Sequence, residues 1–375
     1  MRIGINARFL LASKMEGFGW YTFEITKRLV LNHPEHEFVF FFDRAYDDKF
    51  IFAKNVTPIV LSPPARHPLL FIYWFEFALK KALKKQNIDV LFSPDGYLSL
   101  RSNVPQIAVI HDINFEHFPE DIPLTPRIYL RHYFPKFAKK ATKIITVSEA
   151  SKSDITKTYK IDASKIRVAW NGASEHFKPV DEETRHSIAN YYCNGKPYFL
   201  FVGAIHPRKN IKRLIEAYIQ FKKNSTSEIQ LVIVGESLWK NKTLNVSISD
   251  DISSQIHFTG HLPIEELAKV MGSAFALTYV PYFEGFGIPL VEAMKCGVPI
   301  LSGNKTSLPE VGGDAALYCD PFDVNEIAEK MQEISTSESL RENLKQNGLE
   351  RSKLFSWDKS AEIVWEEILA LTPKN

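Results

Sequence analysis

The sequence is poor in cysteine and has no long hydrophobic run. Its three cysteines, Cys193, Cys296 and Cys319, are odd in number and widely spaced, which argues against a disulfide framework or a zinc site. The longest apolar run, residues 69–75, has seven residues, whereas a helix needs about 20 to cross a bilayer. The first residues show no secretory leader pattern. We therefore expect a cytoplasmic chain with no membrane-spanning helix.

A large excess of charge of one sign is also lacking. The chain has 46 basic and 44 acidic residues, a net charge of +2, which gives no reason to expect nucleic-acid binding. The two halves differ, because residues 1–175 carry 25 basic and 18 acidic side chains (net +7) and residues 176–375 carry 21 and 26 (net −5). The first half is therefore suited to an anionic partner.

Two signature motifs are absent as well. No Asp-x-Asp occurs, so a common carboxylate pair for a divalent ion is missing and we expect no metal. The first strand is not followed by Gly-x-Gly-x-x-Gly, since Gly17 and Gly19 come some ten residues after Asn6 and no third glycine follows. A nicotinamide oxidoreductase is therefore a weak interpretation.

What is present is an alternation of short β-branched or aromatic runs with longer helical segments, which is typical of parallel α/β sheets. At about 100 to 200 residues per domain, the chain has room for two domains. Strands are expected at residues 2–6, 38–42, 59–61, 89–92, 106–110, 143–147, 198–202, 230–234, 256–258, 274–278, 299–301 and 316–319. The pattern restarts at Tyr198, so we expect an N-terminal domain over 1–175 and a C-terminal domain over 176–356.

Two segments connect these domains in our interpretation. Residues 172–196 are polar and charged, with no strong strand signal, and we expect the inter-domain linker there. Residues 357–371 carry an apolar helical stripe that must be buried against another element. The C-terminal segment 357–375 is therefore expected to form a helix, with a return to the first domain as one option.

Ligands of open α/β sheets bind beyond the carboxyl ends of the strands. Gly17 and Gly19 stand just before a helix, where backbone amides can approach a phosphate, although they can also serve only as a helix cap. His111 and Asp112 directly follow a strand and are suited to hydrogen-bond a sugar hydroxyl. The alternative is that Asp112 is a turn cap and His111 a satisfied edge residue.

The second half holds two stronger patterns. Arg208 and Lys209 follow the strand that ends before Gly203, and a guanidinium beside an ammonium suits a diphosphate; a solvated basic turn is the alternative. Further on, Glu284 and Glu292 bracket a loop with two glycines and a helix start. If all eight residues were helical, the two carboxylates would lie about 12 Å apart, so they are expected to contact different parts of a long ligand.

These residues resemble the large family of retaining glycosyltransferases called family 4, or glycosyl transferases group 1, with the two-domain GT-B fold. The motifs that carry the resemblance run in order along nearly the whole chain: His111-Asp112, Ser148-Glu-Ala-Ser151, Asn171-Gly172, Pro207-Arg-Lys-Asn210, Glu284-x7-Glu292 and Thr306-Ser-Leu-Pro-Glu310. The resemblance implies two Rossmann-like doubly wound domains that face each other across a cleft, with the acceptor on the first and the nucleotide sugar on the second.

The resemblance also implies roles for individual residues. In the transfer step, Arg208 and Lys209 would neutralise the donor diphosphate, and His111 would lie near the transferred sugar. The remaining donor-binding positions are Gly17, Gly19, Gly203, Glu284, Phe286, Gly287, Glu292, Ser307 and Leu308. Within this set Glu284 and the amides of Phe286 and Gly287 would hold the sugar, and Glu292 the ribose hydroxyls. Two positions depart from the family pattern, Ala204 and Pro281, where Arg and Ser are common.

We therefore expect a hexosyltransferase that moves a sugar from a nucleotide diphosphate donor to a glycan or lipid-linked hydroxyl, with retention and without a cofactor. The motifs resemble those of bacterial mannosyltransferases of surface polysaccharide or lipopolysaccharide synthesis, which implies GDP-mannose. A nucleotide-sugar epimerase or another GT-B enzyme would share the donor clamp and is the alternative.

The segment 66–85 joins an aromatic run to a basic end. This combination suits a peripheral contact with the inner face of a membrane. A buried helix with a solvated basic end is the competing interpretation, which we favour because aromatic stripes usually belong to a core.

Overall fold

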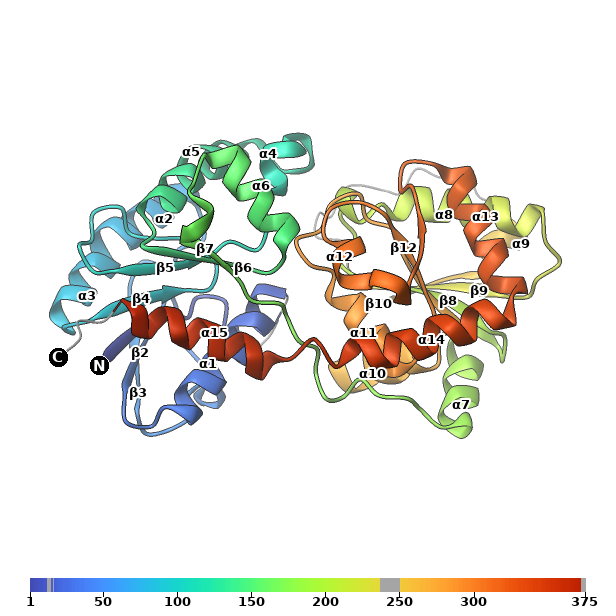
Figure 1. Cartoon of the computed structure of the whole chain (residues 1–375), viewed down its shortest axis with the longest axis horizontal. Coiled ribbons are helices and arrows are strands. Elements are labelled where there is room, and N and C mark those ends of the chain that lie inside the picture. The colour runs from blue at the N-terminus through green and yellow to red at the C-terminus, as the bar shows by residue number, and fades with distance from the viewer. Residues whose placement is uncertain (12–14, 16, 237–249, 372–375) are drawn as a thin grey trace. The chain divides into compact units, whose positions relative to one another are not determined.

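The computed structural model describes residues 1–11, 15, 17–236 and 250–371. They form two compact units (Figure 1). Unit 1 comprises Met1–Asn171 together with the segment that begins at Ser356, and unit 2 comprises Gly172–Phe355. Each unit is built on one parallel sheet that helices cover.

Unit 1 contains a seven-stranded sheet in the order β3-β2-β1-β4-β5-β6-β7. Its strands are β1 (Arg2–Asn6), β2 (Glu37–Phe42), β3 (Val56–Val60), β4 (Val90–Ser93), β5 (Gln106–Val109), β6 (Lys143–Thr146) and β7 (Ile166–Val168). The last of these was not predicted, because it has three residues with Arg167 exposed in the middle. The chain order reverses between β1 and β4, and such a switch point is where ligands bind in open α/β sheets.

Helices lie on both sides of this sheet (Figure 1). They are α1 (Gly17–Asn32), α2 (Pro68–Tyr73), α3 (Lys80–Lys85), α4 (Asn114–His117), α5 (Leu124–Lys140), α6 (Glu149–Tyr159) and α15 (Trp357–Ala370). Helix α15 packs along α1, where Arg28 Nε is 2.6 Å from Asp358 Oδ1 and the ring of Trp365 stacks on His33 at 3.6 Å. The apolar stripe of the C-terminal segment is thus buried on unit 1.

Unit 2 contains a six-stranded sheet in the order β10-β9-β8-β11-β12-β13. Its strands are β8 (Tyr198–Val202), β9 (Gln230–Val234), β10 (Ile256–Gly260), β11 (Ala276–Tyr279), β12 (Ile300–Gly303) and β13 (Leu317–Cys319). Strands β8 and β11 are neighbours, and the chain order reverses between them. The doubly wound α/β fold predicted from the alternating pattern is confirmed in both units.

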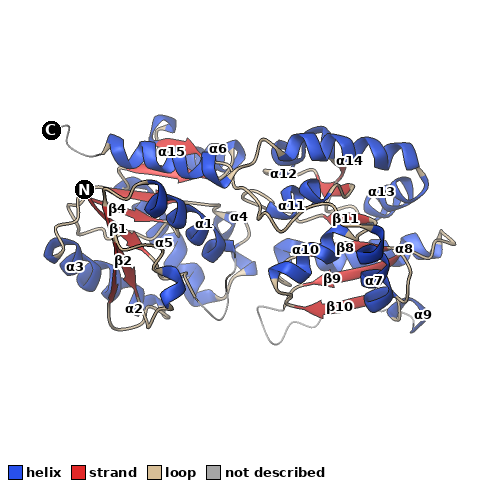
Figure 2. Cartoon of the chain, turned by 90° about the horizontal axis from the view of Figure 1, so that it is seen from below, coloured by secondary structure: helices blue, strands red, loops and turns tan. Residues whose placement is uncertain are grey.

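The helices of unit 2 also form two layers, as Figure 2 shows for α8 and α10 to α14 around the strands. They are α7 (Glu182–Cys193), α8 (Ile211–Lys223), α9 (Asp250–Ser253), α10 (Ile264–Gly272), α11 (Ile288–Cys296), α12 (Leu308–Gly312), α13 (Val324–Thr336) and α14 (Glu338–Ser352). Among the described residues, no helix is long and apolar enough to span a membrane. All three cysteines are buried free thiols.

The polar segment 172–196 is more ordered than its composition predicted. It contains α7, which Asp181 caps by accepting a hydrogen bond from the amide of Thr184. Cys193 is buried, and the hydroxyl of Tyr192 donates to Glu266 of α10 at 2.6 Å. Almost half of the expected linker is therefore a helix of unit 2, because one cap and a few packed residues outweigh its polar composition.

Candidate functional site

The two basic residues predicted after β8 meet one carboxylate. Arg208 and Lys209 lie in a short 3-10 turn, Pro207–Lys209, between β8 and α8, and Glu284 lies in the loop between β11 and α11. Arg208 Nη1 is 3.0 Å from Glu284 Oε1, and Lys209 Nζ forms an ion pair with the same oxygen. The structure thus brings together three predicted residues at the switch point of the unit 2 sheet.

Tyr279, the last residue of β11, completes this cluster. Its hydroxyl accepts a hydrogen bond from Lys209 Nζ at 2.7 Å and donates one to Glu284 Oε1 at 2.9 Å. Burial alone raises the pKa of Glu284, but the charges of Arg208 and Lys209 outweigh it and, with these hydrogen bonds, lower this pKa to about 2. Glu284 is therefore ionised at neutral pH, and the two cations and one carboxylate leave one net positive charge.

The loop that follows Glu284 is held by side chains from the segment before α12. The hydroxyl of Ser307 donates to the carbonyl oxygens of Glu284 and Phe286, at 2.9 and 3.0 Å. The amide of Glu284 donates to Thr306 Oγ1 at 3.1 Å. Ser307 is fully buried, so its side chain holds the backbone of this loop from the protein interior.

Gly287 ends this loop in a conformation that favours glycine. Its φ is +98°, and a Cβ at this position would lie 2.8 Å from Leu308 Cδ2. Helix α11 begins at the next residue, with Pro289 in its first turn, where the missing N–H is tolerated. The backbone before Glu292 is therefore not helical throughout, and the helical spacing assumed for Glu284 and Glu292 does not apply.

Glu292 is half-buried on α11 and has no charged neighbour that compensates its burial. The carboxyl makes no hydrogen bond or ion pair with the residues that the structure describes, and burial raises its pKa to about 8. At neutral pH this carboxyl is therefore mainly protonated, and hydroxyl donors beside it would favour its charged form.

Gly203 stands between β8 and the basic turn. Its φ is +149°, and a Cβ there would lie 3.7 Å from Lys209 Cε. This distance is an ordinary van der Waals contact, so the positive φ, and not a lack of space beside Lys209, favours glycine where the chain leaves the strand.

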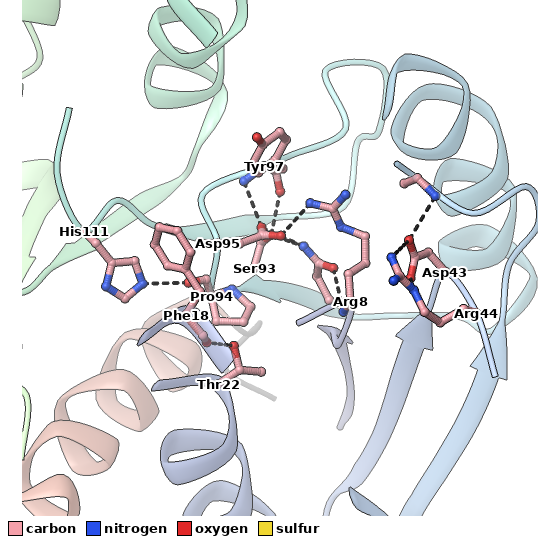
Figure 3. Close-up of polar contacts among 12 residues, drawn as sticks. Arg8, Phe18, Thr22, Asp43, Arg44, Ser93, Pro94, Asp95, Tyr97 and His111 are labelled. Atoms are coloured by element: carbon pink, nitrogen blue, oxygen red, sulfur yellow. Dashed lines mark hydrogen bonds and ion pairs between the residues drawn. The ribbon is translucent and has the colours of Figure 1, made fainter. Parts of the chain in front are cut away.

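In unit 1, His111 lies just beyond β5 (Figure 3). Its Nε2 is 2.9 Å from the carbonyl oxygen of Pro94. The rings of Tyr21 and Phe18 pack edge-on against it, with centroids at 4.6 and 4.8 Å. Burial lowers the pKa of His111, so the imidazole is neutral at physiological pH.

The next residue, Asp112, caps a turn. Its Oδ1 accepts a hydrogen bond from the amide of Asn114 at 3.0 Å, as a turn cap does. Of the two interpretations of Asp112, the structure therefore contains the turn cap. The amide of Asn114, two residues further on, binds the Asp112 carboxylate.

Gly17 and Gly19 lie in the first turn of α1 rather than in a loop before it. A Cβ on Gly19 would lie 2.8 Å from the carbonyl oxygen of Phe9, whereas one on Gly17 would meet no described atom within 4 Å. Packing therefore requires Gly19, while Gly17 is unconstrained by its neighbours. Amides in a first helical turn lack intrahelical partners and can bind an anion.

Sequence reasoning missed Tyr279 and Arg8. Tyr279 lies one residue beyond the strand expected at 274–278, and its position at the switch point is a signal that its hydroxyl faces polar residues. Arg8 lies two residues beyond the first expected strand, where it is buried and paired with Asp95. Neither partner is readable from sequence, because each pairing joins residues about 70 to 90 positions apart.

Family models and relatives agree with this architecture. The model of glycosyl transferases group 1 matches residues 187–351, and the model of glycosyltransferase family 4 matches residues 15–176. The chain therefore belongs to this family of glycosyltransferases, and it is an enzyme of the transferase class.

Two curated relatives are similar over much of their length. The O-antigen chain mannosyltransferase B of Escherichia coli is 29% identical over 356 residues, which cover 92% of this chain and 93% of that protein. The O-antigen chain mannosyltransferase RfbU of Salmonella typhimurium is 27% identical over 286 residues, or 74% of this chain and 75% of that protein.

Among solved structures, WaaG, a glycosyltransferase involved in lipopolysaccharide biosynthesis, superposes with a TM-score of 0.75 at 17% identity. The match covers 98% of this chain and 99% of that chain. At this identity the likeness concerns the fold, which is the two-domain GT-B fold expected from the motifs.

Proposed function

We propose that this glycosyltransferase moves mannose from GDP-mannose to a hydroxyl group of a glycan or lipid-linked acceptor in surface polysaccharide synthesis, with retention at the anomeric carbon. The observation that carries the proposal is the convergence of Arg208, Lys209 and Glu284 at the switch point of unit 2. The two O-antigen relatives are named mannosyltransferases, which supports mannose as the sugar and a polysaccharide product.

In this proposal Arg208 and Lys209 bind the diphosphate of the donor. A diphosphate carries more negative charge than a single carboxylate, so it competes with Glu284 for the two cations. Negative charge grows on the leaving diphosphate in an oxocarbenium-like transition state, and preorganised cations stabilise it. The two cations then do the work of a metal ion, and no cofactor is required.

Glu284 and Glu292 bind different parts of the donor. The recorded contacts of the Glu284 carboxylate fall on Oε1, which leaves Oε2 for a hydroxyl of the sugar, assisted by the amides of Phe286 and Gly287. Glu292 lacks a partner among the described residues and would accept hydrogen bonds from the ribose hydroxyls. Gly203 would let the backbone pass close to the phosphates.

Unit 1 would provide His111 beside the transferred sugar and the acceptor. The Gly17 and Gly19 amides at the start of α1 would add hydrogen bonds to the diphosphate. No residue is assigned as a nucleophile that would form a covalent intermediate with the sugar. Retention then follows if the acceptor hydroxyl attacks the anomeric carbon on the face from which the diphosphate leaves.

We further propose that unit 1 contacts an anionic membrane surface, where a lipid-linked acceptor would be found. The aromatic run divides between two environments: Trp74 and Phe75 are buried, whereas Leu69, Tyr73 and Phe77 are 69, 50 and 49% exposed. These three lie four residues apart, so they share one helical face. Lys80, Lys81 and Lys84 are exposed on the turns that follow. An exposed apolar stripe with a basic end is typical of an interfacial helix.

The decisive experiment offers the purified chain GDP-mannose, UDP-glucose and other nucleotide sugars with glycan acceptors, and reads transfer and linkage by NMR. We expect transfer from GDP-mannose with an α-linked product. Transfer from a UDP-sugar instead would overturn the donor assignment, an inverted product would overturn retention, and interconversion of the sugar without transfer would favour an epimerase.

A further inference from the structure

A buried ion pair lies at the switch point of the unit 1 sheet (Figure 3). Arg8 Nη2 donates to Asp95 Oδ2 at 2.7 Å, and the two side chains are 5 and 2% exposed. Asp95 Oδ1 accepts further hydrogen bonds from Asn6 Nδ2 at 2.7 Å and from the amide of Tyr97 at 3.1 Å. The carboxylate therefore ties the segment after β1 to the turn after β4.

Burying this ion pair costs free energy, because both charges lose their hydration. The Arg8 guanidinium is enclosed by aromatic rings, and its Nε has no hydrogen-bond partner among the described residues. The guanidinium carbon lies 4.7 to 5.7 Å from the centroids of five aromatic rings, those of Phe9, Phe71, Trp74, Phe75 and Tyr97. Apolar residues often replace a buried ion pair without loss of stability. A role in fixing geometry explains the pair better than a role in stability.

The turn that Asp95 fixes also holds His111. The carbonyl oxygen of Pro94, one residue before Asp95, is 2.9 Å from His111 Nε2. Because a carbonyl oxygen only accepts, Nε2 carries the proton of the neutral ring, and Nδ1 is left as an acceptor. Among the residues that the structure describes, Asp112 and Asp95 act on this ring through their charge, and neither hydrogen-bonds to it.

We propose that Arg8 and Asp95 are positioning residues that, through the Pro94 carbonyl, set the tautomer and orientation of His111 so that its Nδ1 accepts a hydrogen bond from a hydroxyl of the transferred sugar. This inference rests on the proposed function, in which His111 lies beside that sugar. Arg8 and Asp95 themselves are too deeply buried to touch a substrate.

The first test reads the tautomer without any assay of activity. In ¹⁵N-histidine-labelled protein, the His111 signals are assigned by their absence in His111→Ala, and we expect a protonated Nε2 and an unprotonated Nδ1. The double variant Arg8→Met/Asp95→Asn removes both charges together, so no single charge is left buried. It is expected to give mixed tautomers in a folded protein.

A neighbouring pair provides the matched control. Asp43 also pairs with an arginine, Arg44, at the end of β2, and its Oδ2 accepts from the amide of Ala65. Figure 3 shows both pairs. The double variant Arg44→Met/Asp43→Asn should leave the His111 signals unchanged, since no contact between the described residues links this pair to Pro94.

The second test is a double-mutant cycle on transfer. We expect Arg8→Met/Asp95→Asn to lower kcat/KM roughly tenfold in the wild-type background and less than about twofold in the His111→Ala background, because coupled residues are not additive. Arg8→Lys is the milder second variant, with a smaller effect in the same direction if the double variant is poorly folded.

The outcomes separate the two hypotheses. An unchanged tautomer in folded variants, or losses that multiply with His111→Ala, would overturn the positioning role. If no nucleotide sugar is transferred at all, the proposed function fails, while the NMR result still decides whether the pair sets the tautomer.

Discussion

At the switch point of unit 2, the two cations Arg208 and Lys209 both pair with one carboxylate oxygen of Glu284. Their side chains remain 23 and 13% exposed. At the same point of unit 1, the ion pair Arg8–Asp95 is enclosed by aromatic rings, and the accessible group is a neutral histidine. The same doubly wound topology therefore presents charge in one unit and a neutral acceptor in the other. Partly exposed cations suit a diphosphate, whereas a fixed, neutral imidazole suits an uncharged hydroxyl.

The largest expected effect concerns the charged site. Lys209→Ala should lower kcat roughly 10²-fold or more, because a preorganised cation acts on charge that develops in the transition state. Lys212→Ala is the control, since that lysine lies one turn further on, is 59% exposed and pairs with Glu216. Steady-state kinetics with a saturating donor measure both. Near-normal turnover of the Lys209 variant would remove this residue from catalysis.

The second prediction compares a glycine from each unit. Gly287→Ala should lower stability by about 1 to 3 kcal/mol, because it forces a strained φ and a close contact with Leu308. Gly17→Ala meets no neighbour, so the melting temperature should hold and any rise in donor KM would report a close approach of the ligand. Thermal melts and donor titrations distinguish the two effects. Equal KM for Gly17→Ala and wild type would argue against a phosphate contact there.

The third prediction uses the pKa of Glu292, which burial raises to about 8. Hydroxyl donors from the ribose favour the ionised carboxylate and lower this pKa. GDP binding at pH 7.5 should therefore release a fraction of a proton, and affinity should rise with pH until about 8 and then level off. Isothermal titration in two buffers of different ionisation enthalpy measures the release.

Glu292→Gln is the matched control for this linkage, since the amide keeps the shape of the side chain and does not titrate. The variant should bind GDP with no such proton release and with a flatter pH profile. Release equal to that of the wild type would assign the proton to another group and remove Glu292 from the ribose site.

The smallest expected effect concerns the surface charge of the two halves, +7 in residues 1–175 and −5 in residues 176–375. Flotation with vesicles that contain anionic phosphatidylglycerol should carry the protein upward, and added salt should weaken this binding. Leu69→Ser/Tyr73→Ser/Phe77→Ser should abolish it. Equal flotation with neutral vesicles, or none at low salt, would contradict the membrane contact.

Much of the architecture was predictable because a buried parallel strand must be apolar on both faces. Strands such as β2 and β8 are continuous hydrophobic runs, and their order along the chain leaves few topologies. The Glu284 motif and the Arg208-Lys209 pair were also identified, since glycine, proline and adjacent cations are local signals. The helix α7 and the short strand β7 were missed, because a cap or a few packed residues decided them against composition.

The sequence by itself determined two doubly wound sheets, the positions of the residues that follow their strands, and the charge difference between the halves. Only the tertiary structure decided that Tyr279 joins Lys209 to Glu284, that Glu292 lacks a partner among the described residues, and that Arg8 reaches Asp95. The physical reason is that hydrogen bonds and pKa values depend on distances of a few ångströms between residues far apart in the chain, and a local pattern carries no information about such distances.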